Sequence, residues 1–587
     1  MKGFFEKILF IDLSKRSSEI RSLNPNIYSL YLGGKGIGTY LLFKENQPKI
    51  DPLSPLNSII FTHGPATDTG LLGSSRYGVY TKSPQTGIYS ESYSGGDVSI
   101  PLSRTGFDAI VIKGALDKPG FLEITDKGVN FFDAKDIWGL EIYEAEDKLL
   151  KRVGKKGAQA IVIGPAGERL IKFSVIANNY WRSAGRTGVG AVLGSKKLKG
   201  IVFHGEKRRE IYDPKRIKEI NEIIIENGKD DPRIEGYQKM GTSILVSIMN
   251  ELGGFPTKYW SKGTLNGWEN VSGESLIERC EISSRSCPDC FLSCSKQSTV
   301  KYGRHAGLTV GGPEYETIYA FGGLCMITSI EEIIYLNDLC DRLGMDTISA
   351  GNLVAFAIEA TKRKKISFKI EYGDVDAIAK LLEMIAKKEG IGEILANGII
   401  YASKKWDLQN LAIHVKGLEP AGYEPRILKG MGLAYATSDR GACHLRSSFY
   451  TKEISGEVDP SMINGKAKLL VEQEDRLTLF DALILCRFYK DLIGWEEIIE
   501  IVHALIGTRY DQNGLRKIAA RITDLARHYN LREGVTKADD TLPRRLLSET
   551  LGDKKRGITK KELNLMLKQY YQMRGWSKDG IPPMPAI

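Results

Sequence analysis

Cysteine and histidine are scarce in this chain, which has 8 cysteines and 7 histidines among 587 residues. The opening stretch MKGFFEKILFIDL lacks the basic start, long apolar core and small-residue cleavage site of an export signal. Charges interrupt the best apolar runs before they reach the roughly 20 residues that a membrane-spanning helix needs. We therefore expect a soluble cytoplasmic protein, without a membrane partner, whose thiols stay reduced.

A concentrated positive face is also missing from the sequence. The net charge of +10 arises from 82 basic and 72 acidic residues, which are spread along the chain apart from short runs such as KRKK at 362–365. A nucleic-acid-binding protein would need a basic face or a known module. We expect no nucleic-acid partner, and the mild positive excess favours an acidic protein partner.

The hydrophobic pattern changes near residue 210. Before this point, short β-rich runs such as ILFIDL, SIIFTHG, DAIVIKG and QAIVIGP alternate with glycine and proline turns. Beyond it, apolar residues recur at helical spacing in EEIIYLNDLCDRLGM, DAIAKLLEMIAKKEG and EEIIEIVHALIG. The sequence predicts an α+β multidomain protein with a β-rich N-terminal part and a mostly α-helical remainder.

The few thiols are unevenly placed, because RSCPDCFLSCSK brings Cys287, Cys290 and Cys294 within eight residues. Clustered cysteines in a reduced protein usually bind metal or take part in redox chemistry. Both a zinc ion and a four-iron cluster need a fourth ligand, and the spacing leaves both open. The other cysteines are the candidates for that ligand: Cys280, Cys325, Cys340, Cys443 and Cys486.

Glycines gather in LGGKGIG, SYSGG and SAGRTGVGAVLGSKKLKG, with Arg76, Arg182 and Arg186 nearby. Arginine presents a planar fork of donors to phosphate, and glycine-rich backbone can offer N–H groups to the same oxygens. A phosphate-bearing ligand would explain both features, although ordinary β turns with surface arginines explain them equally well. None of the three stretches is a Walker loop, and a Rossmann site is weakly supported.

Two further segments, DRLGMD and DALILC, place an aspartate five positions before a second ligand-type residue. Their carboxylates could accept paired hydrogen bonds from the amino-amidine edge of a pterin. The pattern occurs by chance in any large protein, so it gains meaning only from its context.

That context is a set of motifs in one order along the chain. They are LGGKGIGTYLL, DPLSP, GPATDTG, TKSPQTG, SGG, GFDAIVIKG, IGPAGE, AGRTGVGAVLGSKKLKGI, CPDCFLSC, GGPEYET, GMDTIS, DRGACHLR, NLREG, DDTLPRRLL and YYQMRGW. Over essentially its whole length the sequence resembles the aldehyde ferredoxin oxidoreductase family of tungsten enzymes. The resemblance implies an N-terminal β domain, residues 1–210, that cradles two pterins, followed by two helical domains, residues 211–417 and 418–587.

The resemblance also implies cofactors and the residues that bind them. One tungsten would be held by two pyranopterins, with a Mg²⁺ ion bridging the pterin phosphates and a 4Fe-4S cluster nearby. The implied cluster ligands are Cys287, Cys290, Cys294 and Cys486. The residues implied at the pterins and their phosphates are Arg76, Gly95, Gly96, Arg182, Ser183, Gly185, Arg186, Asp341, Asp346 and Asp481.

Glu314 in PEYET and His444 in CHLR match the family's carboxylate and imidazole near the tungsten. They imply proton transfer and carbonyl polarisation during the oxidation of a small aldehyde to a carboxylic acid. Oxygen would come from water, and electrons would pass through the cluster to ferredoxin or an iron-sulfur electron-transfer subunit.

The sequence departs from the family pattern at a subunit-bridging iron site. Some members bind this iron through E-x2-H motifs, but Tyr335 and Lys362 stand where histidines would be required. An interfacial iron is therefore not expected, and a homodimer through other contacts is left open. Cys325 falls in a stretch where a related branch has a cysteine bound to tungsten, although a buried free cysteine is the commoner outcome.

Two alternative functions remain at this stage. One is the catalytic subunit of a larger tungsten redox complex that resembles an aromatic acyl-CoA reductase. The other is a zinc-stabilised binding protein without redox activity. Neither the aldehyde nor the choice of tungsten over molybdenum follows from the sequence.

Overall fold

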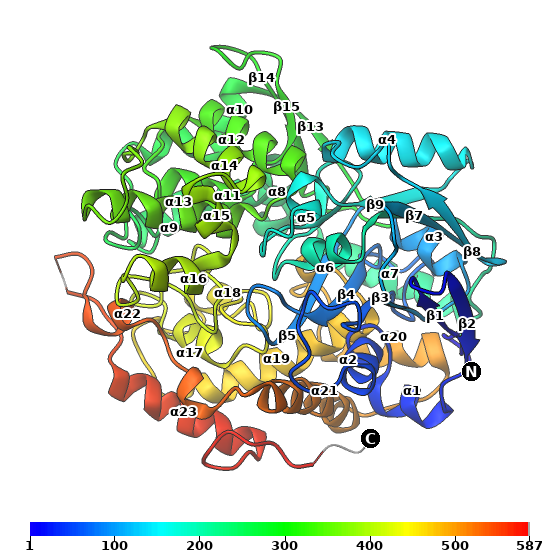
Figure 1. Cartoon of the computed structure of the whole chain (residues 1–587). Coiled ribbons are helices and arrows are strands. Elements are labelled where there is room, and N and C mark those ends of the chain that lie inside the picture. The colour runs from blue at the N-terminus through cyan, green and yellow to red at the C-terminus, as the bar shows by residue number, and fades with distance from the viewer. Residues whose placement is uncertain (554, 585–587) are drawn as a thin grey trace.

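The computed structural model describes residues 1–553 and 555–584 (Figure 1). Two six-stranded sheets form the N-terminal part, and helices make up most of the remainder, which confirms the expected fold class. The first sheet has the order β2 (Ser17–Arg21), β1 (Ile8–Asp12), β6 (Ala109–Lys113), β3 (Ile59–Thr62), β4 (Tyr77–Lys82), β5 (Tyr89–Ser94).

The second sheet has the order β11 (Arg182–Ala184), β10 (Ile176–Asn178), β9 (Gln159–Val162), β12 (Leu198–Phe203), β7 (Gly120–Thr125), β8 (Gly128–Asp133). In each sheet one pair of strands is parallel, β1 with β6 and β7 with β12, and the other pairs are antiparallel. Strand β11 of the second sheet lies against β5 of the first. The loops that follow β5 and β11 therefore lie close together.

Burial on both faces explains why the central strands are apolar throughout. In β6, Ile110 and Ile112 join the core between the two sheets, whereas Ala109 and Val111 join the core beneath the C-terminal helices. Such a strand has no polar face and reads as a continuous hydrophobic run. The outer faces are covered by α2 (Gly34–Glu45), α20 (Trp495–Ile506) and α21 (Gln512–Glu533) on the first sheet, and by α4 (Ile142–Val153) on the second.

The segments with helical periodicity are helices in the structure. Helices α12 (Ile330–Leu343) and α14 (Val375–Lys387) gather on one side of the molecule with the rest of the green part of the chain, and the yellow to red helices run along the bottom of Figure 1. Other long helices are α7 (Pro214–Gly228), α13 (Thr347–Lys362), α19 (Lys466–Leu483) and α23 (Lys560–Arg574). A small antiparallel sheet interrupts them, formed by β13 (Cys280–Arg285), β14 (Ser295–Val300) and β15 (Thr309–Gly311).

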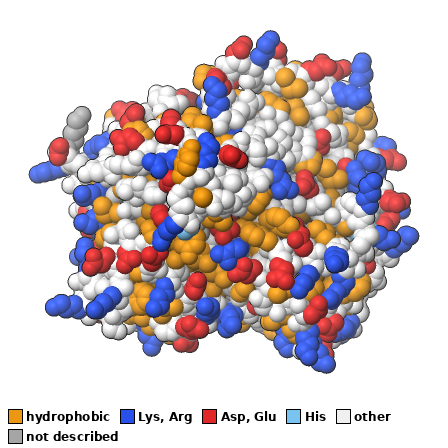
Figure 2. Space-filling model, turned by 90° about the horizontal axis from the view of Figure 1, so that it is seen from above, with side chains coloured by type: hydrophobic (Ala, Val, Ile, Leu, Met, Phe, Trp, Pro, Cys, Tyr) orange, Lys and Arg blue, Asp and Glu red, His pale blue; other side chains and the backbone are white. Residues whose placement is uncertain are grey.

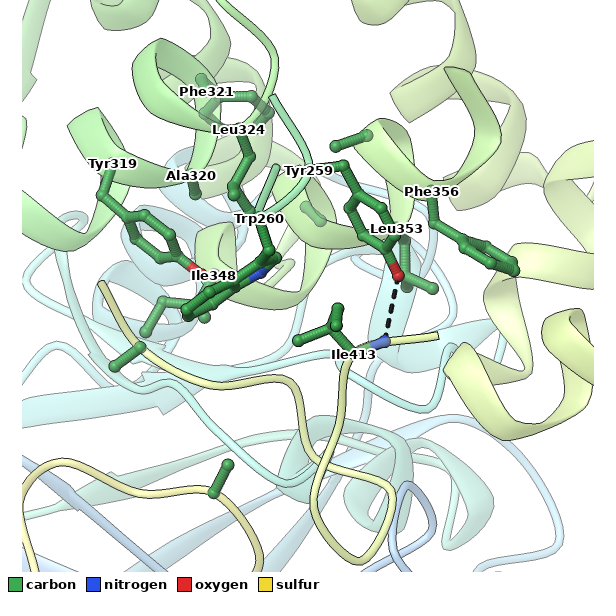
Figure 3. Packing of buried hydrophobic residues seen from close by; sticks show 14 of the residues in the cluster. Tyr259, Trp260, Tyr319, Ala320, Phe321, Leu324, Ile348, Leu353, Phe356 and Ile413 are labelled. Atoms are coloured by element: carbon green, nitrogen blue, oxygen red, sulfur yellow. Dashed lines mark hydrogen bonds between the residues drawn. The ribbon is translucent and has the colours of Figure 1, made fainter. Parts of the chain in front are cut away.

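Buried aromatic side chains tie the helical part together (Figure 3). The indole Nε1 of Trp260 donates to Asn352 Oδ1 at 3.1 Å, and the hydroxyl of Tyr259 accepts from Ile413 N at 3.2 Å. These bonds satisfy polar atoms that would otherwise destabilise an apolar core. They join segments more than 90 residues apart in the sequence.

The glycine-rich LGGKGIG segment lies mainly in helix α2, although it is rich in glycines that normally disfavour helices. A Cβ at Gly36 would lie 1.8 Å from the Tyr31 carbonyl oxygen, and one at Gly34 would lie 2.4 Å from the Asp481 carbonyl oxygen. These glycines therefore allow the helix to approach other backbone closely. Close packing against protein backbone explains Gly34 and Gly36, so these two glycines do not indicate a bound ligand.

Acidic and basic side chains are interspersed over the face shown in Figure 2, as the distribution of charge along the sequence predicts. Within residues 1–553 and 555–584, none of the helices combines the length and the apolar character needed to cross a bilayer. The domain boundaries at 210/211 and 417/418 stay predictions.

Candidate functional site

A cavity of about 390 Å³ is lined by residues of both sheets and of the helical part. Its walls are formed by strands β5 and β11 with the loops that follow them, and by the β13–β14 loop. Both ends of the α12–α13 connection and the segment after α19 complete the lining. Of the predicted site residues, all except Gly96 and Asp481 line it. Those that do are Arg76, Gly95, Arg182, Ser183, Gly185, Arg186, Cys287, Cys290, Cys294, Glu314, Asp341, Asp346, His444 and Cys486.

Four thiols meet at one wall of this cavity. The β13–β14 loop supplies three of them, and Cys486 follows the C-terminal end of α19. Backbone hydrogen bonds at Gly73 hold the two segments together, because its carbonyl accepts from Cys486 N and its N–H donates to Asp289 O, both at 2.8 Å. Burial raises the pKa of the Cys294 thiol well above its usual range, and the neighbouring Cys486 adds to this effect.

The other cysteines lie elsewhere. Cys280, Cys325, Cys340 and Cys443 are buried, and none of them is among the described residues that line the cavity. Cys325 lies in the main helical core, where its thiol donates to Gly351 O at 3.5 Å and burial raises its pKa. In the described part of the chain, no three His, Cys, Asp or Glu side chains converge at distances suited to a single metal ion.

Glycines allow backbone to approach the thiols closely. Gly96 N donates to Cys287 Sγ at 3.2 Å, and a Cβ at Gly95 would lie 3.2 Å from the same sulfur. Gly96 adopts a φ of +89°, and a Cβ there would lie 2.4 Å from Asn179 Oδ1. A side chain at Gly96 is therefore excluded by both conformation and space.

Several buried guanidinium groups at the cavity have unused donors. Arg76 Nε, Arg440 Nε and Arg487 Nη1 have no hydrogen-bond partner among the described residues. A buried, unpartnered cationic donor is costly, so these atoms fit an anionic ligand such as a phosphate. Arg440 and Arg487 were not selected from the sequence, although both stand in or beside quoted motifs, DRGACHLR and DALILC.

The three predicted pterin-binding aspartates differ in which protein groups already bond to their carboxylates. Asp346 caps the N-terminus of α13 and accepts from Arg186 Nε at 3.3 Å. Asp481 accepts from Arg446 Nη1 at 3.0 Å and from Arg487. Asp341 lines the cavity, accepts from Asn337, and has a pKa that burial and then the neighbouring Asp338 raise well above its usual range.

The PEYET segment supplies two carboxylates to the cavity, Glu314 and Glu316. Glu314 directly precedes the short helix α11 (Tyr315–Thr317) and accepts from Thr242 Oγ1 at 2.5 Å. Glu316, which the sequence did not single out, places Oε1 3.6 Å from His444 Nε2 and accepts from Gly422 N at 2.9 Å. The PEYET motif contains both glutamates, and their spacing does not reveal which one faces the histidine.

Burial sets the protonation states of Glu316 and His444. It raises the pKa of Glu316 to about 8, and it lowers the pKa of His444 well below its usual range, helped by the nearby cation Arg186. His444 is therefore a neutral imidazole at pH 7. Glu316 can gain or release a proton near neutral pH, which is the range in which a general acid or base works best.

The two positions that break the E-x2-H pattern have protein partners instead. Tyr335 stacks on His305 with ring centroids 4.4 Å apart, and the Nζ of Lys362 lies 3.7 Å from Oε1 of Glu359.

The fold and the cavity define a multidomain protein that can hold a large anionic ligand beside four thiols and an acid–imidazole pair. The model of the aldehyde ferredoxin oxidoreductase N-terminal domain matches residues 8–205, and that of domains 2 and 3 of the same protein matches residues 219–586. The chain belongs to the aldehyde ferredoxin oxidoreductase family.

Relatives cover the chain almost completely. It is 37% identical to a tungsten-containing aldehyde ferredoxin oxidoreductase of Pyrococcus abyssi, over 99% of this chain and 98% of that protein. A protein of the same name from Pyrococcus furiosus is 35% identical over 100% and 98% of the two chains. The active-site complex of a benzoyl-coenzyme A reductase shares the fold, with a TM-score of 0.85 at 22% identity over 99% and 96% of the chains.

Proposed function

We propose that this protein oxidises an aldehyde to a carboxylic acid at a tungsten held by two pyranopterins, and passes the electrons through a 4Fe-4S cluster to ferredoxin. The observation that carries the proposal is one cavity that combines four thiols, unpartnered arginine donors and the Glu316–His444 pair. The full-length relatives named as tungsten-containing aldehyde ferredoxin oxidoreductases support it.

The residues at the cavity fit the proposed cofactors. Cys287, Cys290, Cys294 and Cys486 would bind the cluster, since each thiolate in such a cluster binds a different iron. The guanidinium groups and the glycine-lined backbone would hold the pterin phosphates and their bridging Mg²⁺. These residues are Arg76, Gly95, Gly96, Arg182, Ser183, Gly185 and Arg186, joined by Arg440 and Arg487. Asp341 would accept hydrogen bonds from a pterin, and Asp346 and Asp481 would keep the arginines in place.

The bound metal centre would supply a two-electron oxidation, and the cluster would carry the electrons away singly. The overall reaction balances as aldehyde plus water giving carboxylic acid, two protons and two electrons. His444 orients and polarises the aldehyde carbonyl by donating a hydrogen bond from its neutral ring. Glu316, with Glu314 on the same short segment, takes up a proton released by water.

Metal analysis and an aldehyde panel test this proposal. Protein purified without oxygen should contain tungsten, pterin, iron and acid-labile sulfide, and should reduce a viologen dye when an aldehyde is added. Zinc without tungsten or sulfide, or a tungsten-loaded protein inert to every aldehyde, would contradict it.

A catalytic subunit of a larger tungsten redox complex is the second candidate. The shared fold of the benzoyl-coenzyme A reductase complex favours it, although at 22% identity this likeness concerns the fold alone. An electron-transfer subunit that copurifies stoichiometrically would support this candidate. A homodimer stays a prediction that the mass of the purified particle would test.

A further inference from the structure

Arg440 is a buried cation that has no carboxylate partner in the described part of the chain. It is 3% exposed, and its Nη1 donates to the backbone carbonyl of Glu91. The other buried arginines of this region, Arg186, Arg446 and Arg487, each form an ion pair with an aspartate. Because a buried charge is costly unless an opposite charge lies beside it, Arg440 needs another anion.

The sulfur of Cys443 accepts hydrogen bonds from two donors. Arg440 Nη2 donates to Cys443 Sγ at 2.9 Å, and Leu445 N donates to the same sulfur at 3.4 Å. Cys443 is fully buried and is not among the described residues that line the cavity, so its sulfur faces protein groups. Two donors on one sulfur, one of them cationic, favour the thiolate over the thiol.

The charges around Cys443 favour the same form. Burial by itself raises the pKa of a thiol, but Arg440, Arg446 and Arg186 lower the pKa of Cys443 to about 7. Burial raises the pKa of each of the other buried cysteines, which are Cys280, Cys325 and Cys340. Cys443 therefore differs from the other buried thiols in its electrostatic surroundings.

A thiolate at Cys443 acts on the acid–imidazole pair. The next residue is His444, whose Nε2 lies 3.6 Å from Glu316 Oε1. Burial contributes most to the raised pKa of Glu316, Arg186 lowers that pKa, and Asp346 and Cys443 raise it. The remaining titratable groups near Glu316 are phenols that burial keeps protonated: Tyr315, Tyr319, Tyr423, Tyr435 and Tyr450.

On the basis of the proposed oxidation, we infer that Cys443 is a positioning residue whose buried thiolate orients Arg440 and makes Glu316 a stronger proton acceptor. Arg440 uses Nη1 and Nη2 for Glu91 and Cys443, which leaves its unpartnered Nε for the anionic ligand. The thiolate forms no bond to substrate, and the proton released by water still goes to Glu316.

Infrared spectroscopy tests the charge of Cys443 without turnover. The S–H stretch lies in a spectral window without other protein bands, so a thiolate is detected as missing intensity. In cofactor-loaded wild-type enzyme the S–H intensity should grow between pH 8.5 and pH 5, and this growth should be absent in Cys443→Ser. Cys325→Ser is the matched control, because it removes a buried thiol whose pKa burial raises, so the growth should persist.

A second variant tests the role of the arginine. Arg440→Met removes the cationic donor to Cys443 Sγ, so the S–H band of Cys443 should already be present at pH 8.5. If Cys443→Ser fails to fold, the growth in the wild type and its loss in Arg440→Met decide the charge of Cys443.

The pH dependence of kcat tests the effect on Glu316. Glu316 accepts a proton only when it is unprotonated, so kcat should rise with pH through its pKa. The loss of a negative charge in Cys443→Ser should lower that pKa and shift the midpoint by about one pH unit to lower pH. Cys443→Asp keeps a negative charge and should retain the wild-type midpoint. A merely structural role would lower kcat without moving the midpoint.

The outcomes separate this inference from the proposed function. If loaded enzyme oxidises no aldehyde, the proposed function fails, and the infrared measurement still decides whether Cys443 is a thiolate. An S–H band at pH 8.5 that is present in the wild type and absent from Cys443→Ser would overturn the inference. An unchanged midpoint of kcat in Cys443→Ser would also overturn it, and the oxidation would stand.

Discussion

At the scale of single residues, we propose that Glu316 and His444 handle protons and do not bind the metal. We expect Glu316→Gln and His444→Phe to lower kcat about 100- to 10,000-fold, the usual contribution of a positioned acid or base. Glu314→Gln should lower kcat less, because Glu314 is bonded to Thr242. Steady-state kinetics with tungsten and iron analysis on the same samples measures both effects.

Cofactor content decides how the kinetics are interpreted. The three variants should retain tungsten and iron near the wild-type level. Wild-type kcat in His444→Phe would remove that residue from the mechanism. Loss of tungsten from either of the other variants would instead make its glutamate a support for the cofactor.

The buried carboxyl of Glu316 also makes a prediction about stability and pH. Burial raises its folded-state pKa to about 8, above the ordinary value of 4.5. The folded protein then keeps a proton that the unfolded chain releases, so this group's stabilising contribution is lost as pH rises from about 4.5 through 8. In cofactor-free protein, Glu316→Gln should gain stability relative to the wild type over that range.

Denaturant unfolding at pH 5 and pH 8.5 measures this gain. The exposed Glu281→Gln serves as a control, because it removes a carboxylate that lies in water. A difference between Glu316→Gln and the wild type that is the same at both pH values would show that Glu316 is not protonated in the folded state.

At the scale of elements, the β10–β11 hairpin supports the segment 94–97, whose backbone contacts the Cys287 thiol. Asn178 Nδ2 donates to Gly95 O at 3.0 Å, and its Oδ1 accepts from Ser94 Oγ at 2.7 Å. Asn179 Oδ1 accepts from Asp97 N at 2.9 Å. These bonds hold the backbone that presents Gly96 N to Cys287 Sγ.

Asn178→Ala should therefore weaken the Gly96 hydrogen bond to sulfur. Because hydrogen bonds to cluster sulfurs help set the reduction potential, we expect the midpoint potential of the loaded cluster to become more negative. A redox titration followed by electron paramagnetic resonance measures it. Asn130→Ala is the control, since Asn130 on β8 donates to Glu123 of β7 and is not bonded to the loop or to Asn178 or Asn179. An unchanged potential in Asn178→Ala would contradict the link.

Elements differ in how far the sequence predicts them. Strands β1, β3 and β6 were recognisable because burial on both faces makes them continuous apolar runs. Strands β10 and β11 have only three residues each, too few to show an alternating pattern, so their pairing with each other defines them. Helix α2 was hidden by its glycines, which close packing against distant backbone requires.

At the scale of the whole molecule, the four thiols at the cavity come from segments almost 200 residues apart, Cys287 to Cys294 and Cys486. Cys486→Ala should lose the cluster or make it labile, whereas Cys280→Ala and Cys340→Ala should keep it, because these two cysteines lie away from the cavity. Iron and sulfide content with the four-iron signal measures the outcome. A complete four-iron signal in the Cys486 variant would show that another ligand completes the cluster.

The candidate site was only partly predictable, because its residues come from segments that lie far apart in the sequence. Cysteine spacing left five candidates for the fourth ligand, and the family resemblance alone favoured Cys486, which the structure places beside the other three. Glu316 and Arg440 were missed because their roles depend on a meeting between α11, the 438–449 loop and the sheets. Contacts of that kind carry no local sequence signal.

Aldehyde oxidation coupled to ferredoxin reduction is tested most directly by counting both products in one anaerobic reaction. Loaded enzyme, an aldehyde and oxidised ferredoxin should yield about two reduced ferredoxins for each carboxylate, since the oxidation releases two electrons and the cluster passes them singly. Carboxylate formation without ferredoxin reduction, or no carboxylate from an enzyme that contains tungsten and its cluster, would contradict the proposed function.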